Sequence, residues 1–149
     1  MTKERNQVAV KLLEAFRQFH RVSWNRSPII GIKPSEIMVL FCISKKAVID
    51  SPGIKVSEIS SLLKVAPPTV TQLINGLEDS GFIERAMDQE DRRAVRVKLT
   101  EKGQEVIGKA SDAFFDTFNG LVEHLGEEKS KELTELLSEV FVYFNEKNR

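Results

Sequence analysis

The sequence predicts an α+β fold that is mostly α, and two observations support this prediction. Apolar residues recur at the three- and four-residue spacing of amphipathic helices over most of the 149 residues. Between Phe82 and Leu99 the spacing changes, and residues 95–99 alternate strictly between apolar and basic, as in a strand with one buried face. We therefore expect one domain, residues 1–149, in which four helices precede a β-hairpin and two helices follow it.

The four helices before the hairpin are bounded by proline and glycine. Proline is favoured in the first turn of a helix, and glycine is favoured directly after the last turn. With the apolar stripes, these signals place the helices at about residues 3–27, 34–49, 56–64 and 67–80. The second is strongly apolar and is expected at the centre of the core.

The hairpin consists of strands at residues 82–87 and 95–99, with a polar loop between them. Thr100 can cap a fifth helix, because its hydroxyl accepts a backbone N–H in the first turn. Gly126 separates this fifth helix from a sixth. The terminal helices, at about 3–27 and 101–147, thus flank a central unit at about 34–100.

The overall charge is zero, with 22 basic and 22 acidic residues, but the charge is unevenly distributed. Residues 1–46 contain nine basic and three acidic residues, whereas residues 104–149 contain five basic and ten acidic residues. A polyanionic partner would therefore contact the first two thirds of the chain.

Several classes of function lack support in the sequence. Cys42 is the single cysteine and lies among apolar neighbours, so a buried structural role is favoured over redox sensing. His20 and His124 have no ligand cluster around them, and we expect no metal site and no cofactor. We expect no enzymatic activity, because no nucleophile with an adjacent base and no phosphate-binding glycine loop is visible. Without an apolar run of membrane-spanning length or a secretory signal, we expect a cytoplasmic protein with no membrane partner.

The fourth predicted helix has one apolar face and one polar face. Helical spacing places Val70, Leu73, Ile74 and Leu77 on the buried side. The opposite side carries Pro68, Thr71, Gln72 and Asn75. Amide side chains can bond the edge of adenine in the major groove of DNA, and threonine can contact a base or a phosphate. Two short helices of this kind form a helix-turn-helix, although a solvated polar face is an equally common explanation.

The hairpin loop strengthens the DNA-binding interpretation. It contains Asp91-Arg92-Arg93, and a basic loop beside a recognition helix can insert an arginine into the minor groove. We expect the Asp91 carboxylate to orient one guanidinium through a charge-assisted hydrogen bond.

Residues 56–103 resemble the DNA-binding half of the MarR family of bacterial transcriptional regulators. The resemblance rests on Val56-Ser57-Glu58-Ile59, Thr69-Val70-Thr71-Gln72-Leu73-Ile74, Leu77-Glu78-Asp79-Ser80-Gly81-Phe82-Ile83-Glu84-Arg85, Asp91-Arg92-Arg93 and Leu99-Thr100-Glu101-Lys102-Gly103. It implies a winged helix-turn-helix and a homodimer held by the terminal helices, in which each subunit reads half of a pseudo-palindromic double-stranded operator. Two departures from the family pattern, Ala66 and Gln72, remove a hydroxyl and a cation, so affinity is expected to depend more on the wing.

The resemblance also implies which residues contact DNA and where an effector binds. Those expected at or near DNA are Pro67, Pro68, Thr69, Thr71, Gln72, Asn75, Arg92 and Arg93. The family commonly binds a small lipophilic or phenolic ligand between the terminal helices and the winged unit. The candidate aromatic residues are Phe16, Phe19, Trp24 and Phe41, for which an ordinary core role is the alternative. The function implied is a ligand-modulated repressor; a winged protein-interaction module without DNA binding is the alternative that zero net charge leaves open.

Overall fold

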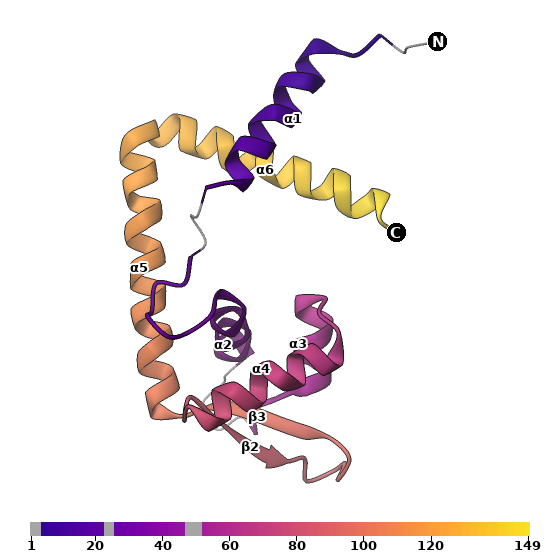
Figure 1. Ribbon diagram of the computed structural model, residues 1–149, viewed down its shortest axis with the longest axis vertical. Helices are drawn as coiled ribbons and strands as arrows, with labels where there is room; N and C mark the ends of the chain where they lie inside the picture. Colours follow the sequence, from indigo (N-terminus) through magenta and orange to yellow (C-terminus); the bar gives the residue numbers. More distant parts are fainter. Residues whose placement is uncertain (1–3, 23–25, 47–51) are drawn as a thin grey trace.

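The computed structural model describes residues 4–22, 26–46 and 52–149. Its central unit contains three helices and a small sheet, and three further helices flank this unit (Figure 1). The helices are α1 (Gln7–His20), α2 (Pro34–Lys46), α3 (Val56–Leu63), α4 (Pro67–Asp79), α5 (Glu101–Leu125) and α6 (Glu127–Lys147). The strands are β1 (Ile54–Lys55), β2 (Ile83–Met87) and β3 (Val95–Leu99). The predicted order of helices and hairpin is confirmed, and residues 47–51, into which the second helix was predicted to continue, lie outside the described part.

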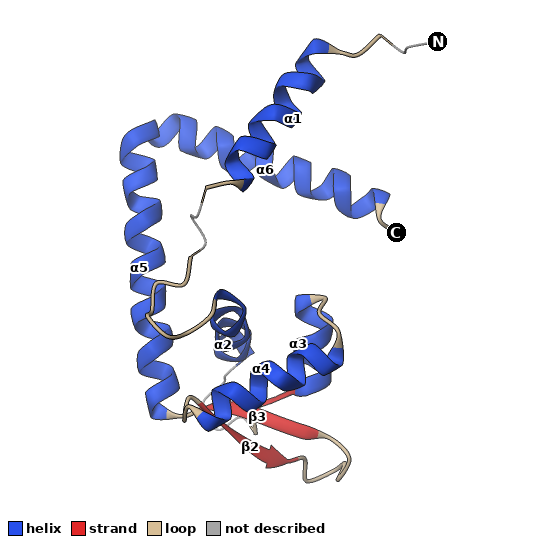
Figure 2. Ribbon diagram, in the orientation of Figure 1, coloured by secondary structure: helices blue, strands red, loops and turns tan. Residues whose placement is uncertain are grey.

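The sheet contains one strand more than the sequence predicted. Its order is β1-β3-β2, with antiparallel neighbours throughout. The hairpin register pairs Ile83 with Leu99 and Met87 with Val95, and β1 pairs Ile54 with Val97. A strand of two residues is too short to show an alternating pattern, which explains why β1 was missed. The helices and the sheet with its loop are distinguished by colour in Figure 2.

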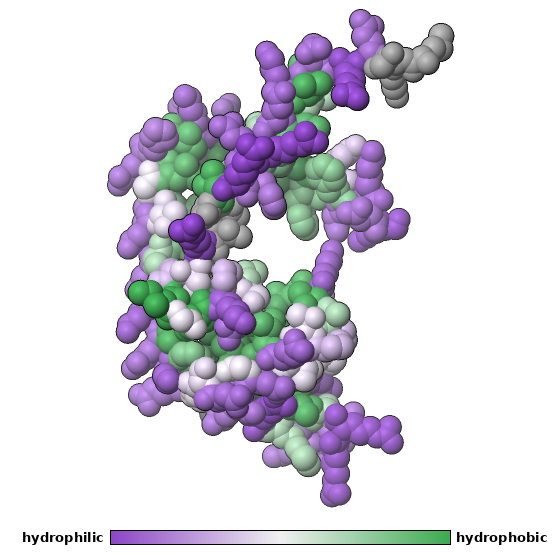
Figure 3. Space-filling view, in the orientation of Figure 1, coloured by the Kyte–Doolittle hydropathy of each residue, from purple (hydrophilic) through white to green (hydrophobic). Residues whose placement is uncertain are grey.

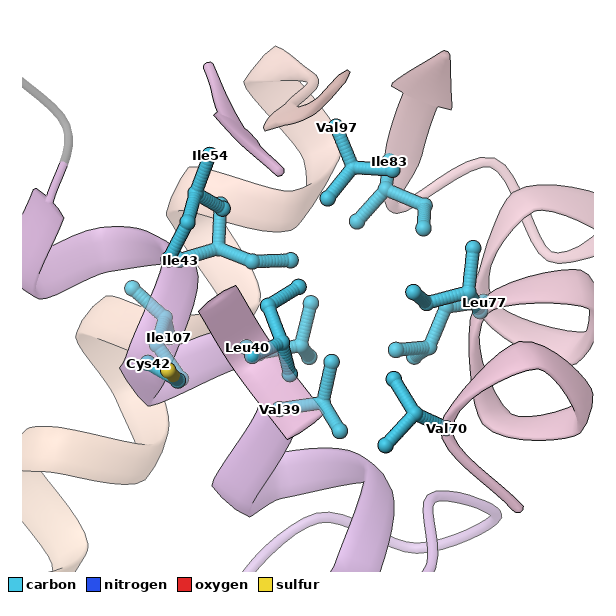
Figure 4. Packing of buried hydrophobic residues seen from close by; sticks show 12 residues of the cluster. Val39, Leu40, Cys42, Ile43, Ile54, Val70, Leu77, Ile83, Val97 and Ile107 are labelled. Carbon is cyan, nitrogen blue, oxygen red and sulfur yellow. The ribbon is translucent and has the colours of Figure 1, made fainter. Parts of the chain in front are cut away.

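The core lies where α2 meets α3, α4, α5 and the sheet. Its side chains are aliphatic, and those that are fully buried include Leu40, Leu77 and Val97 (Figure 4), together with Ile59 and Ile74. On α4 the buried residues are Val70, Ile74 and Leu77, while Leu73 is partly buried against them. This confirms the predicted buried face of α4. The opposite face is exposed.

The start of α5 is joined tightly to the end of α4. The Thr100 hydroxyl donates to the carbonyl of Gly81 over 2.6 Å and accepts the N–H of Gly103 over 3.1 Å. The Lys102 ammonium donates to the carbonyl of Ser80 over 2.9 Å. These hydrogen bonds therefore attach the end of α4 to the start of the long helix α5.

The two terminal helices α1 and α6 lie away from this core. In the figure they cross at the far end of α5, opposite the sheet (Figure 1). Among their described residues none is buried, although both helices carry large apolar side chains. Hydrophobic surface is visible over both helices in Figure 3.

Over the described residues, no helix combines the length and the apolar character required to cross a bilayer. Within the same residues, no group of three or more His, Cys, Asp or Glu side chains is placed to hold a metal ion.

Candidate nucleic-acid interface

The outer face of α4 is exposed and polar. Pro67, Pro68, Thr69, Thr71, Gln72 and Asn75 are all exposed. The Thr71 hydroxyl donates to the carbonyl of Pro67 over 3.0 Å, so toward a ligand its oxygen acts as an acceptor. The six α4 residues that were predicted to contact DNA therefore lie together on one accessible surface.

The N-terminus of α4 offers few donors to an anion. Ala66 is the N-cap and forms no side-chain cap bond, and prolines occupy the first two helical positions. Proline has no N–H, and the N–H of Thr69 already donates to the carbonyl of Ala66 over 3.0 Å. An anion bound beside this surface would therefore need donors from side chains elsewhere.

The wing tip is shaped by two aspartates that accept backbone N–H groups. Asp88 accepts from Glu90 over 3.2 Å, and Asp91 accepts from Arg93 over 3.0 Å. Such Asx turns fix the backbone two residues ahead and leave the intervening side chains projecting outward. Arg92 and Arg93 are both exposed, and hydrophilic side chains project at the tip of the wing in Figure 3.

The expected role of Asp91 is wrong in one respect. Its carboxylate holds the backbone N–H of Arg93, and in the described part of the chain no ion pair joins Asp91 to an arginine. Asp91 thus orients the loop through its backbone, whereas we expected it to orient a guanidinium. The two-residue spacing strongly favours the backbone contact, because it closes an Asx turn.

Asp88, which directly follows β2, forms the ionic contacts of the wing. Asp88 Oδ2 lies 3.3 Å from Arg96 Nε and 3.7 Å from Lys55 Nζ. Arg96 also donates from Nη1 to the carbonyl of Gly53 over 2.8 Å. The pKa of Asp88 lies below its ordinary value, first because the Glu90 N–H donates to the carboxylate, and then because Arg96 and Lys55 lie beside it. This cluster connects the wing to the loop that precedes β1.

Recognition helix and wing border a common groove of about 300 Å³. Thr71 and Ile74 of α4 line one side, and Arg93, Ala94 and Val95 of the wing line the other. Its remaining lining residues are Lys55, Val56, Ser57 and Arg85. Lys55 and Arg85 lie beside the carboxylates of Asp88 and Glu78, whereas no ion pair of Arg93 is found among the described residues, so Arg93 contributes the unpaired positive charge of this groove.

Arg85 is the main site residue that the sequence reasoning missed. Its Nη2 donates to Asn75 Oδ1, and its Nε lies 3.3 Å from Glu78 Oε2. A signal was present in the strand pattern: Arg85 follows the buried Ile83 by two residues, so both point to the same face of the sheet, toward α4.

Two of the four aromatic residues proposed for an effector pocket, Phe16 and Phe41, line different hollows in the described part of the chain. Phe16 lines a groove of about 420 Å³ between α1 and α6, whereas Phe41 lines a separate hollow of about 250 Å³ beside α3. Phe41 also packs on Phe114, with ring centroids 5.9 Å apart. Phe19 is exposed on α1, and Trp24 lies outside the described residues. Their helical spacing placed Phe16 and Phe19 on one helix but carried no information about the distance to α2.

Cys42 is buried on α2, as predicted. Only 8% of its surface is exposed, and burial raises the pKa of its thiol. It is part of the aliphatic core cluster (Figure 4).

These features define a class of protein: a winged helix-turn-helix with a polar recognition helix and a basic wing. Comparison with known proteins gives the family. The model of the MarR family matches residues 32–95. A crystal structure of the transcriptional regulator Tm0710 from Thermotoga maritima is 30% identical and has a TM-score of 0.55, over 95% of this chain and 96% of that one. The chain belongs to the MarR family, which is a family of transcriptional regulators.

Two further comparisons extend this result. The HTH-type transcriptional regulator BilQ of Clostridioides difficile is 30% identical over 81 residues, which are 54% of this chain and 55% of BilQ. The chain thus spans about half the length of the curated relatives that it matches. The MepR–DNA complex of S. aureus has a TM-score of 0.73 at 20% identity, over 94% of this chain and 99% of that one, which shows a shared fold.

Proposed function

We propose that this chain binds double-stranded DNA as a homodimer and thereby regulates transcription. The observation that carries the proposal is the groove shared by α4 and the wing. Its cations, Lys55, Arg85 and Arg93, lie between a polar helix face suited to base edges and an arginine loop suited to the minor groove. A phosphate backbone that passes between the major and minor grooves would meet positive charge there.

The proposed contacts follow from this placement. Thr71, Gln72 and Asn75 read bases, with Pro67, Pro68 and Thr69 near the major groove. Arg92 and Arg93 reach the minor groove, and Asp91 shapes the loop that presents them. The MepR structure, of the same fold, contains DNA, which supports DNA as the partner of this winged unit.

The terminal helices support a homodimer. Large apolar side chains of α1 and α6 are exposed, and extended apolar surface of this kind marks an interface. A second copy of the chain would cover this surface and would give the two α4 helices the two-fold symmetry of a palindromic operator.

Regulation by a ligand is the further part of the proposal. Family resemblance points to a repressor whose operator affinity falls when a small lipophilic or phenolic molecule binds. Such a ligand would act by favouring a dimer geometry in which the two α4 helices no longer match the half-site spacing. Titration of the DNA complex with phenolic carboxylates would test this, because an effector must lower the affinity measured at constant salt.

A salt titration of DNA binding tests the main proposal. Operator sites are first selected from a random duplex pool, and affinity is then measured by fluorescence anisotropy from about 50 to 200 mM salt with random-sequence competitor. Substitution of Arg92 and Arg93 by alanine is expected to weaken binding and to reduce the slope of log K against log salt by about one per lost phosphate contact. Lys109→Ala removes an exposed cation of α5, far from the groove, and serves as the matched control that leaves the slope unchanged.

Two results would contradict the proposal. One is an absence of enriched sites in the selected pool, and the other is an unchanged salt slope in the double arginine variant. Either would favour the alternative, a winged module that binds proteins and not DNA.

A further inference from the structure

The side-chain amide of Asn75 is oriented by Arg85. The two residues come from different elements, α4 and β2, and the Arg85 guanidinium donates from Nη2 to Asn75 Oδ1. A guanidinium has no acceptor, so the group of Asn75 that faces it must be the oxygen and not the amino group. The assignment of the amide therefore follows from the chemistry of the pair.

Arg85 is itself anchored on the recognition helix. Its Nε lies 3.3 Å from Glu78 Oε2, and Glu78 follows Asn75 by three residues on the same helix face. Arg85 also lines the groove between α4 and the wing. One guanidinium thus bridges two side chains of α4 while it borders the surface proposed to contact DNA.

This arrangement changes what Asn75 offers to a base pair. An unrestrained asparagine binds adenine with two bonds, in which its oxygen accepts from N6 and its amino group donates to N7. Here one lone pair of the oxygen accepts from a cation. An adenine amino group that used the second lone pair would bring its donor hydrogens next to the guanidinium, which repels them. The amino group of Asn75 can only donate, and guanine presents two acceptors, O6 and N7, in the major groove.

We propose that Arg85 sets the base specificity of α4 by making Asn75 a donor, so that the base pair at Asn75 is read as guanine in preference to adenine. This inference rests on the proposed DNA-binding function and adds to it the identity of one operator base. Arg85 is a positioning residue in this role, because it acts on the base through the amide of Asn75.

Comparison of selected operators tests the inference. Duplex sites are selected from a random pool with the full-length protein and with the variants Asn75→Ala, Arg85→Met and Arg85→Lys. The operator position read by Asn75 is the one whose base preference is lost in Asn75→Ala. At that position the unsubstituted protein is expected to select guanine, and Arg85→Met, which frees the Asn75 oxygen, is expected to select adenine.

The size of the change and the controls follow from the chemistry. The ratio of the affinities for guanine and adenine probes should change by at least about fivefold in favour of adenine in Arg85→Met. This is the change expected from the free energy of one good base contact. Arg85→Lys keeps a donor and a positive charge and should retain the guanine preference. Gln72→Ala should alter a different operator position, and thermal unfolding of each variant measures whether the fold is intact.

The outcomes separate the inference from the function on which it rests. Selection of adenine at the Asn75 position by the unsubstituted protein, or an unchanged preference in a folded Arg85→Met variant, overturns this inference alone. A pool without enrichment at any position overturns the proposed function and this inference together.

Discussion

Gly103 lies in the first turn of α5, at the point where this helix leaves the sheet. A Cβ at this position would overlap the carbonyl oxygen of Phe82, which is backbone and cannot move aside cheaply. The same carbonyl accepts the N–H of Thr100 over 3.0 Å, so displacement would also disturb the junction between α4 and α5. A glycine that looked in the sequence like part of a motif is thus required by close backbone packing.

We therefore expect Gly103→Ala to lower the free energy of unfolding by roughly 1–3 kcal/mol, the usual cost of overpacking. Gly108 is the matched control in the same helix, because no atom lies within 4 Å of a Cβ built there. Gly108→Ala should be neutral or stabilise by about 1 kcal/mol through helix propensity. Urea unfolding of both variants measures the difference, and equal stabilities would show that the contact with Phe82 is not limiting.

Asp88 is expected to make the stability of the folded chain depend on pH. Its pKa is lower in the folded chain than its ordinary value of 3.8, so folding favours the ionised carboxylate. This contribution is complete above the ordinary pKa and is lost as pH falls through the lower, folded-state pKa. Asp88→Asn should therefore be less stable than the unsubstituted chain at neutral pH, and the gap should narrow below about pH 4. Thermal unfolding at several pH values measures the gap; a gap that is constant down to strong acid would contradict the role of the charge.

At the scale of an element, some features of the wing could be predicted from the sequence and others could not. Its position after the recognition helix and its two arginines were predictable from strand alternation and the charged loop. The partner of Asp91 was not, because a carboxylate beside two arginines fits both an ion pair and an Asx turn, and only the loop backbone decides between them. The pairing of Asp88 with Arg96 depends on the hairpin register, which the loop length did not define.

Substitution of Asp91 distinguishes these two roles. Asn can still accept the N–H of Arg93, so Asp91→Asn should preserve the wing, whereas Asp91→Ala should loosen it. The wing tip contains two trypsin sites, Arg92 and Arg93, and limited proteolysis should cleave the alanine variant several times faster. If trypsin cleaved the unsubstituted protein and Asp91→Ala at the same rate, the Asx turn would not be what holds the wing. Rapid cleavage of Asp91→Asn would show that the negative charge of Asp91 is needed.

The recognition helix was the most predictable element, and its reading surface was predictable only in part. The periodicity of Val70, Ile74 and Leu77 was sufficient to assign the exposed face. The bond between Asn75 and Arg85 joins residues of two elements, and its existence depends on how the sheet packs against α4. Under the proposed function, the composition of this helix face predicts that it can read bases, and the tertiary contact between Asn75 and Arg85 predicts which base is preferred.

At the scale of the whole molecule, the two surfaces that we propose bind partners lie at opposite ends of α5 (Figure 1). The groove of the winged unit carries the cations, and the far end of α5 carries α1 and α6 with their apolar side chains exposed. Leu12 of α1 and Leu136 of α6 line one groove and retain 56% and 57% of their surface exposed. At about 25 cal/mol per Å² of apolar area, surface of this extent favours association with a second copy.

We expect Leu12→Glu combined with Leu136→Glu to convert the proposed dimer to a monomer at micromolar concentration, because a charge buried without a partner is strongly unfavourable. Met87→Glu is the control, since Met87 is 67% exposed but lies on β2, away from α1 and α6. Light scattering coupled to gel filtration measures the mass of each protein. A monomer should bind a single half-site and lose the advantage of a palindrome, because the second α4 helix is no longer held at a fixed distance. A double variant that keeps the dimeric mass would place the interface on another surface, and DNA affinity that depends equally on both half-sites in a monomer would contradict the proposed geometry.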